Sequence, residues 1–224
     1  MKITFGLTVE PRVYPFTYYE QLARSFYDRT PSYELHDDMS LHSIGWIRGH
    51  ADATRRGLVF SRSSTWSVGV VHRDVLEEFL ASIEEDPEII PGVRIESATP
   101  VKAHGGRVRY LAESPILIRR DGHHHRFDEP EANEGLTFSL RAKLKAIGID
   151  SSVCDTAEAI FDTDYEKPRT KVVHIGKATY LSNVCPIYID ADQPLLHELA
   201  MSAGLGGLTG MGLGAILPAS QQTA

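Results

Sequence analysis

The chain has 224 residues, of which 42% are hydrophobic and 24% charged, which is typical of a globular protein with one large domain or two small ones. Its net charge of −7 argues against a nucleic-acid partner unless the cations are segregated on the surface. No apolar run approaches the ~20 residues that span a bilayer, and the strand-like start Met1 to Leu7 is unlike a signal peptide, so we expect a cytoplasmic protein without a membrane partner.

The first part of the chain predicts the element order strand, helix, strand, strand, helix, strand. Alternating residues indicate the strands, and apolar residues at helical spacing indicate the helices. The strands are expected over 2–9, 57–61, 66–71, 93–103 and 107–111, and the helices over 17–29 and 72–85. We interpret His104-Gly105-Gly106 as a hairpin turn between the last two strands. This order is the ferredoxin-like βαββαβ pattern.

The same order recurs in the second part. Strands are expected over 115–120, 171–175, 178–189 and 213–217, and helices over 135–147 and 194–203. The acidic segment 148–170 is expected to be a surface excursion. The sequence therefore predicts an α+β fold of two tandem ferredoxin-like (RRM-like) domains, the first over residues 1–113 and the second over 114–224.

Cations cluster in two stretches despite the negative net charge. Arg48 to Arg73 carries five arginines against the single acid Asp52, and Lys167 to Ser182 carries four cations and no acid. Charges are screened beyond about 8–10 Å, so a local basic track can bind phosphates even on an acidic protein. Solvated charges scattered over the fold are an equally good interpretation of the composition alone.

A glycine-rich stretch, Gly204 to Gly214, follows the last predicted helix and precedes the last strand. Glycine adopts positive φ and lets backbone N–H groups come close to a ligand, so such a loop can cradle phosphates. The stretch lacks the Gly-Lys-Ser/Thr of a Walker loop, and it does not lie near the start of a βαβ unit as a Rossmann turn does. A tight structural turn is the competing interpretation.

Five motifs, in order along nearly the whole chain, resemble the Cas6 (Cas-six) family of CRISPR repeat-RNA-processing endoribonucleases, which belongs to the RAMP superfamily. The matching segments are Leu41-His42-Ser43-Ile44-Gly45, Leu58-Val59-Phe60-Ser61 followed by Trp66, Ser114-Pro115-Ile116, Gly204-Leu205-Gly206 and Gly210-Met211-Gly212-Leu213-Gly214. The second segment lacks one phenylalanine of the family pattern. Each motif alone is weakly specific, and their shared order carries the resemblance.

The resemblance implies an endoribonuclease that needs no metal or cofactor. In that family the 2′-hydroxyl attacks the adjacent phosphate and leaves 2′,3′-cyclic phosphate and 5′-hydroxyl ends. The reaction needs a base, an acid and positive charge at the phosphate, and the histidine pKa of about 6.5 suits the proton transfers. The family's histidine corresponds to His42, its tyrosine to Tyr27 and its lysine to Arg48. Arginine can hold phosphate charge but is too basic to act as a base.

Other assignments of the histidine stay open. His36 and His50 are rivals of His42, and His42 can instead be an idle residue that packs or faces solvent.

RNA recognition is expected from cations that flank the groove between the halves and from the glycine-rich stretch. The candidate RNA-binding residues are Arg55, Arg56, Arg62, Arg119, Arg120, Arg141, Lys143, Lys145, Lys171, Lys177, Gly204, Gly206, Gly207, Gly210 and Gly212. For each cation taken alone, an ordinary surface charge explains the sequence as well. Trp46, Trp66 and Tyr180 are candidates for base stacking, although core packing is the better interpretation of Trp66.

His123-His124-His125 suggests a metal site. Three consecutive side chains point in different directions on a strand or a helix, so they rarely converge on one ion. We therefore expect a hairpin tip and predict no metal site.

The expected partners are CRISPR repeat RNA (precursor crRNA), which the protein is expected to cut and then retain, and other CRISPR-associated proteins of an interference complex. The chain is expected to be a monomer or a homodimer. Two alternatives stay open: a non-catalytic crRNA-binding subunit with an idle His42, and a nucleotide or anion binder that uses the glycine-rich stretch.

Overall fold

The first sheet is built around strand β1, Lys2–Val9, in a computed structural model that describes residues 1–32 and 39–221. Ile3, Phe5 and Leu7 alternate along β1 and are buried, so one face of the strand packs into a core. The sheet has the antiparallel order β2-β5-β1-β7-β6. Its other strands are β5 (Ser63–Val70), β7 (Val93–Pro100) and the short edge strands β2 (His42–Ile44) and β6 (Glu88–Ile90).

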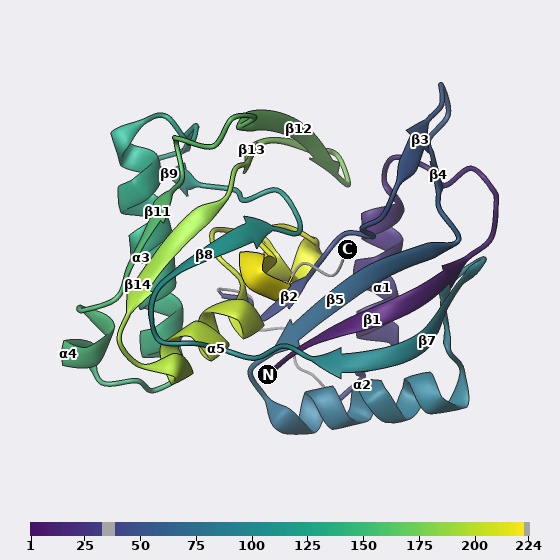
Figure 1. Ribbon diagram of the computed structural model, residues 1–224, viewed down its shortest axis with the longest axis horizontal. Coiled ribbons are helices and arrows are strands. Elements are labelled where there is room, and N and C mark those ends of the chain that lie inside the picture. The colour runs from purple at the N-terminus through teal and green to yellow at the C-terminus, as the bar shows by residue number, and fades with distance from the viewer. Residues whose placement is uncertain (33–38, 222–224) are drawn as a thin grey trace.

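Two amphipathic helices cover the buried face of this sheet (Figure 1). Helix α1, Tyr18–Asp28, contributes Leu22 and Phe26 to the core, and helix α2, Arg73–Glu85, contributes Phe79. Trp66 of β5 is 1% exposed and packs against Phe79, so its expected place in the core is confirmed. The alternate residues of β1, among them Thr4 and Gly6, lie on the opposite face of the sheet and point away from this core.

The second sheet repeats the topology of the first. Its order is β11-β14-β8-β15, from β8 (Gly106–Ala112), β11 (Glu158–Phe161), β14 (Ile187–Ala191) and β15 (Ile216–Pro218). Helices α3, Pro130–Ala146, and α5, Pro194–Ala203, share its core, and the short α4 covers Ser151–Cys154. In both sheets the first strand of the half lies between its third and fourth, which is the ferredoxin-like arrangement, so the predicted tandem fold is confirmed.

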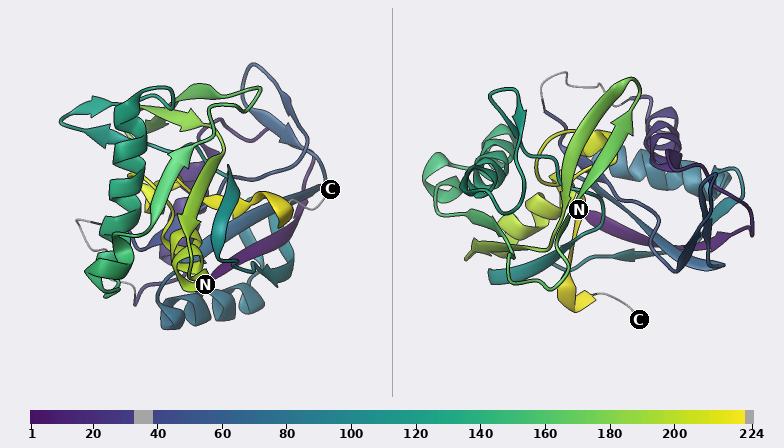
Figure 2. Two further views of the ribbon diagram at one scale, coloured as in Figure 1. Left: turned by 60° about the vertical axis from the view of Figure 1, so that its left-hand side comes forward. Right: turned by 90° about the horizontal axis from the view of Figure 1, so that it is seen from above.

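Three hairpins extend from the sheets, and two 3₁₀ turns lie near the C-terminus. The hairpins are β3–β4 (Ala51–Ala53 and Leu58–Phe60), β9–β10 (Arg119–Arg120 and His123–His124) and β12–β13 (Arg169–Ile175 and Ala178–Val184), and the turns are η1 (Thr209–Met211) and η2 (Ala219–Gln221). Seen from above, β12–β13 lies between the two halves (Figure 2). It contacts α1 there, because Tyr19 Oη donates to His174 O at 2.5 Å. No helix within the described ranges is long and apolar enough to cross a membrane.

Several predicted boundaries are wrong in the structure. His104-Gly105-Gly106 is not a hairpin turn, because β8 leaves the first sheet and pairs with β14 and β15. The strand expected over 178–189 divides at Pro186, which has no N–H to donate, into β13 and β14 of different sheets. Segment 148–170 contains α4 and β11, and the strand expected over 115–120 is regular only at β9. The domain division between residues 113 and 114 stays a prediction, although the sheets themselves divide between β7 and β8.

The two halves are joined by close backbone packing and by a buried ion pair. The end of α5 lies on β5 at Gly69, where a methyl group would come within 2.6 Å of Met201 O. Lys2 Nζ lies 2.7 Å from Glu113 Oε2, and both side chains are almost fully buried. Ser67 also donates to Glu113, so the residue that follows β8 is bound to two strands of the first sheet.

Glu113→Ala should lower the free energy of unfolding by about 3–5 kcal/mol, because the variant leaves the buried Lys2 ammonium without its counter-ion. The exposed helical pair Arg73–Glu77 is the matched control, and Glu77→Ala should cost about 0.3–0.5 kcal/mol. Urea unfolding measures both values. Equal losses for the two variants would contradict the assigned role of the buried pair.

Candidate active site at the junction of the halves

His42 and Tyr27 form a buried pair at the edge of the first sheet. His42 is the first residue of β2 and is 1% exposed. Its ring stacks on the ring of Phe26 of α1, with the centroids 5.2 Å apart. Tyr27 lies near the end of α1, and its Oη is 2.8 Å from His42 Nε2. The same hydroxyl donates to Gly210 O at 3.2 Å. The structure therefore brings together the histidine and the tyrosine that the sequence motif predicts.

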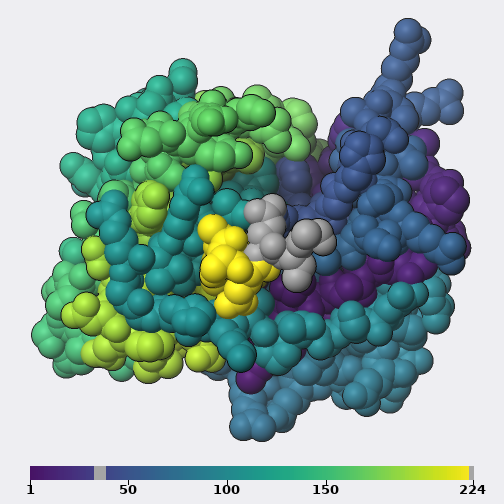
Figure 3. Space-filling view, viewed as in Figure 1, coloured from purple at the N-terminus to yellow at the C-terminus, as the bar shows by residue number. Residues whose placement is uncertain are grey.

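The glycine-rich stretch covers this pair. It enters the η1 turn through Leu208, which has a left-handed φ of 59°, and leaves it at Gly212 with φ 84°. Between them Gly210 touches the pair so closely that a methyl group on it would come within 2.5 Å of His42 Nε2. Trp46 Nε1 donates to Gly212 O at 2.6 Å, which fixes the end of the turn to the first half. Figure 3 shows the C-terminal residues (yellow) between the two halves.

Most backbone donors of the predicted phosphate cradle are engaged within the protein. The N–H groups of Gly204, Gly206, Gly207 and Gly212 donate to Ala200 O, Ser139 Oγ, Leu117 O and Thr209 O, respectively. Gly204 and Gly206 also have positive φ, and added methyl groups would collide with neighbouring atoms. These contacts favour the structural-turn interpretation of the stretch over a small-anion cradle.

Lys143 approaches the same turn from the second half. It lies on α3 and is 5% exposed, and its Nζ donates to Ala203 O at 2.8 Å and to Thr209 Oγ1 at 3.0 Å. Thr209 is the neighbour of Gly210, so the lysine and the His42–Tyr27 pair contact adjacent residues of one turn. This lysine was predicted as one of three basic contacts on α3, and only the structure places it at this junction.

Burial controls the protonation of the site. The pKa of His42 is lowered to about 3, mainly by desolvation and to a smaller extent by the nearby charge of Lys143. Desolvation also lowers the pKa of Lys143 to about 7. At neutral pH the buried imidazole is therefore neutral and only weakly basic, whereas the amine titrates near that pH.

Arg48 does not join the pair, which corrects its predicted place beside His42. Ile47 points into the helix-covered core, so Arg48, the next residue of an extended segment, points to the opposite face of the sheet. Its guanidinium lies 3.9 Å from Glu113 and lines a separate pocket with Thr4 and Gly6. His50 also lies outside the buried pair. Its side chain is 80% exposed, and its Nε2 lies 3.3 Å from Asp52 Oδ1. His36 falls outside the described residues.

The other predicted RNA-binding residues occupy several places. Arg55 and Arg56 are exposed at the β3–β4 turn, and Arg62 is exposed between β4 and β5. Arg141 Nε donates to Ala157 O at 2.8 Å, and Lys145 pairs with Asp155 at 3.0 Å.

The β12–β13 hairpin carries two further candidates. Lys171 Nζ lies 4.3 Å from the centroid of the Trp46 ring, and Lys177 is exposed at the turn of the hairpin. Trp46 itself stacks on Tyr19 with the centroids 4.7 Å apart, so both faces of this predicted stacking residue are in contact with protein groups.

One pocket of about 760 Å³ collects the remaining candidates. Arg119, Arg120, Lys143, Gly206 and Gly207 line it. Phe138 also lines it and was missed by the sequence analysis. The available signal was an aromatic residue on α3 between the inward Leu136 and Leu140, at a position that faces solvent.

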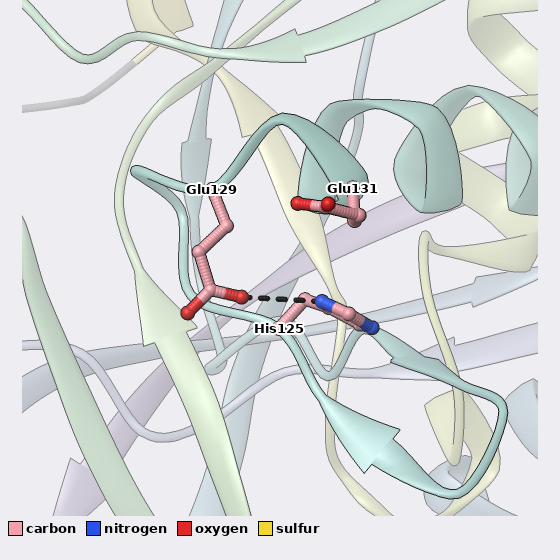
Figure 4. A group of neighbouring side chains, drawn as sticks. All are labelled: His125, Glu129 and Glu131. Atoms are coloured by element: carbon pink, nitrogen blue, oxygen red, sulfur yellow. Dashed lines mark hydrogen bonds and ion pairs between the residues drawn. The ribbon is translucent and has the colours of Figure 1, made fainter.

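The histidine tract belongs to a hairpin, but the turn of that hairpin is Asp121-Gly122, so the tract follows the tip instead of forming it. His123 and His124 pair with Arg120 and Arg119 in β9–β10. His125 turns toward α3, where its Nδ1 lies 3.1 Å from Glu129 Oε2, with Glu131 nearby (Figure 4). Glu129 and Glu131 lie at the N-terminus of α3, where the helix dipole favours carboxylates, and the contact with Glu129 accounts for the orientation of His125. We assign no ion to this group.

The fold is that of a tandem ferredoxin-like protein with a covered His–Tyr pair at the junction of its halves. The family described as CRISPR associated protein Cas6, C-terminal, matches residues 97–217, which is more than half of the chain. The chain belongs to this Cas6 family.

Solved structures agree with this fold. A RAMP protein described as binding different RNA substrates has a TM-score of 0.77 and 15% identity, with 97% of this chain and 99% of that chain covered. A Cas6-related protein from Pyrococcus furiosus has a TM-score of 0.77, 13% identity and 99% coverage of both chains. A Cas6 product complex has a TM-score of 0.62 and 12% identity, with 97% and 98% covered. No curated protein sequence matches the chain.

Gly210→Ala should lower the free energy of unfolding by about 1–3 kcal/mol, because the methyl group overpacks the His42–Tyr27 pair. Gly207→Ala is the matched control: its methyl group would lie 3.6 Å from the nearest atom, an ordinary contact. Both changes reduce the entropy of the unfolded chain alike, so their difference in urea unfolding isolates the clash. A Gly210→Ala variant as stable as Gly207→Ala would contradict the close packing.

The free energy of unfolding should fall as the pH is lowered from about 6.5 toward 3. In this window an unfolded histidine binds a proton and the buried His42, with a pKa of about 3, does not, so its contribution to stability is complete above the window and is lost as the pH falls through it. Each pH unit costs up to about 1.4 kcal/mol. His42→Asn should show a shallower fall over the same range, and identical slopes for the two proteins would place the histidine pKa near its ordinary value.

Proposed function

We propose that this protein binds CRISPR repeat RNA and cuts the precursor transcript without a metal, leaving 2′,3′-cyclic phosphate and 5′-hydroxyl ends, and that it retains the mature crRNA. The observation that carries the proposal is the hydrogen bond of 2.8 Å between His42 Nε2 and Tyr27 Oη at the junction of the halves. Family membership supports it, as do the RAMP protein described as binding RNA and the Cas6 product complex, which share the fold.

The proposed chemistry divides among three side chains. Once bound RNA has exposed the ring and removed its desolvation, His42 accepts the proton of the attacking 2′-hydroxyl, and the linked Tyr27 hydroxyl donates toward the phosphate or the departing 5′-oxygen. Lys143 supplies positive charge from the second half through its position at Thr209. Arg48 has no place in this scheme, because it faces the other side of the first sheet.

Access to the histidine requires a local movement. The ring is 1% exposed and lies under Gly210, so bound RNA must displace the Thr209–Met211 turn before the 2′-oxygen can reach Nε2. The turn is flanked by the left-handed residues Leu208 and Gly212, where a change of backbone direction is concentrated. The binding energy of the repeat has to supply the cost of this opening.

The same burial favours a second candidate function, a non-catalytic crRNA-binding subunit of an interference complex. In that case His42 and Tyr27 serve only to fix the glycine-rich turn against the first half. RNA binding is common to both candidates, so cleavage separates them.

A synthetic repeat transcript incubated with the wild-type protein in EDTA should be cut at one bond. His42→Ala should lower the cleavage rate by roughly 10²–10⁴-fold, the usual contribution of a general acid or base, and Tyr27→Phe should lower it through loss of the hydroxyl. Gel assays with chemical mapping of the product ends measure both. His50→Ala is the matched control, because this exposed histidine lies outside the buried pair.

Three other outcomes are informative. Tight RNA binding without cleavage by the wild type would favour the non-catalytic subunit. Unchanged cleavage by His42→Ala would exclude His42 as the base and direct attention to His36 or His50. Cleavage abolished by EDTA and restored by a divalent ion would contradict the metal-independent mechanism.

A further inference from the structure

The pocket of about 760 Å³ beside α3, called here the α3 pocket, lies next to the candidate active site. Lys143 and Thr209, which are joined by a hydrogen bond of 3.0 Å, belong to its lining. Gly210, the next residue, contacts Tyr27 and His42. A ligand in the α3 pocket is therefore separated from the His42–Tyr27 pair by one turn of the glycine-rich stretch.

An exposed aromatic ring lies at this pocket. Phe138 of α3 is 73% exposed, although it lies between the buried Leu136 and Leu140. Its position on the solvent side of the helix gives it no role in the core of the second half. An exposed ring of this kind beside a pocket offers a flat apolar surface to a planar group.

The pocket combines this ring with cations. Arg119 is exposed and forms no ion pair with any residue in the described ranges, whereas Arg120 pairs with Glu134 at 2.7 Å. Lys143 is buried, and its contacts with described residues use two of its three N–H donors. The lining thus presents a positive charge at the rim, an amine that donates hydrogen bonds inside and an aromatic face, which is the chemistry that binds an unpaired nucleotide.

We propose that the α3 pocket binds one unpaired nucleotide of the RNA, with its base stacked on Phe138 and its phosphate held by Arg119. The inference rests on the proposed function and extends it. Its volume lies within the ~300–1,000 Å³ usual for small-ligand pockets. A nucleotide held here is separated from the His42–Tyr27 pair by one turn, so its position influences which linkage of the RNA meets His42.

Binding of repeat RNA to Phe138→Ala should be weaker than wild-type binding by roughly 5- to 150-fold, the range for loss of one base stack on an aromatic residue. Phe138→Trp should retain the affinity, because it keeps an aromatic face. Phe16→Ala is the matched control, since Phe16 is 51% exposed in the first half, away from the pocket. Fluorescence anisotropy with labelled repeat RNA measures all four proteins, with His42→Ala as the background to prevent cleavage.

A set of repeat RNAs, each with one abasic nucleotide, identifies the stacked base. One of the abasic RNAs should bind the wild-type background more weakly than intact RNA does. The same abasic RNA and intact RNA should bind Phe138→Ala with equal affinity, because the two changes remove the same contact. Arg119→Ala should reduce the slope of log affinity against log salt by about one, as expected for one phosphate contact. Arg73→Ala, on the exposed face of α2, is the control for that charge.

The outcomes separate the inference from the proposed function. If the wild-type background binds repeat RNA and Phe138→Ala binds it equally well, the inference is wrong and Phe138 is left as a surface for a protein partner. If Phe138→Ala weakens all abasic RNAs to the same extent, no base stacks on the ring, and the inference is again overturned. If no repeat RNA binds at all, the proposed function itself fails.

Discussion

The close approach of Gly210 to the His42–Tyr27 pair is the constraint on which the site depends. The pair belongs to the first half and the turn that covers it follows the last helix of the second, so the site exists only when both halves are docked. A methyl group at this point would come within 2.5 Å of His42 Nε2, so any side chain larger than hydrogen requires the pair or the turn to shift. The buried Lys2–Glu113 ion pair and the close packing of the end of α5 against Gly69 hold the two halves together.

Local signals in the sequence predicted most of the fold and failed where partners are distant. The alternation of 2–9 and the helical spacing of 72–85 and 194–203 correspond to β1, α2 and α5. The assignment of β8 to a hairpin failed, because a glycine turn is a local signal and the true partners, β14 and β15, lie far along the chain. Pro186, in contrast, carried a usable signal for the division of β13 from β14.

Two of the three residues predicted for the candidate active site lie together in the structure, but the environment of the site was not predictable. Motif order led to His42, Tyr27 and the glycine-rich stretch, which the structure brings together. The burial of the imidazole depends on Phe26 and Gly210, and the orientation of Arg48 depends on which face of the sheet its segment presents, so neither follows from spacing alone. Lys143 was found as a basic residue on a helix, but its place at Thr209 is a tertiary property.

A structure of the protein with a repeat RNA that carries a 2′-deoxy group at the scissile position tests the central claim most directly. The account predicts that the Thr209–Met211 turn has moved and that His42 Nε2 lies within about 3 Å of the atoms of the scissile linkage. RNA bound with the imidazole still stacked on Phe26 beneath Gly210 would contradict a catalytic His42.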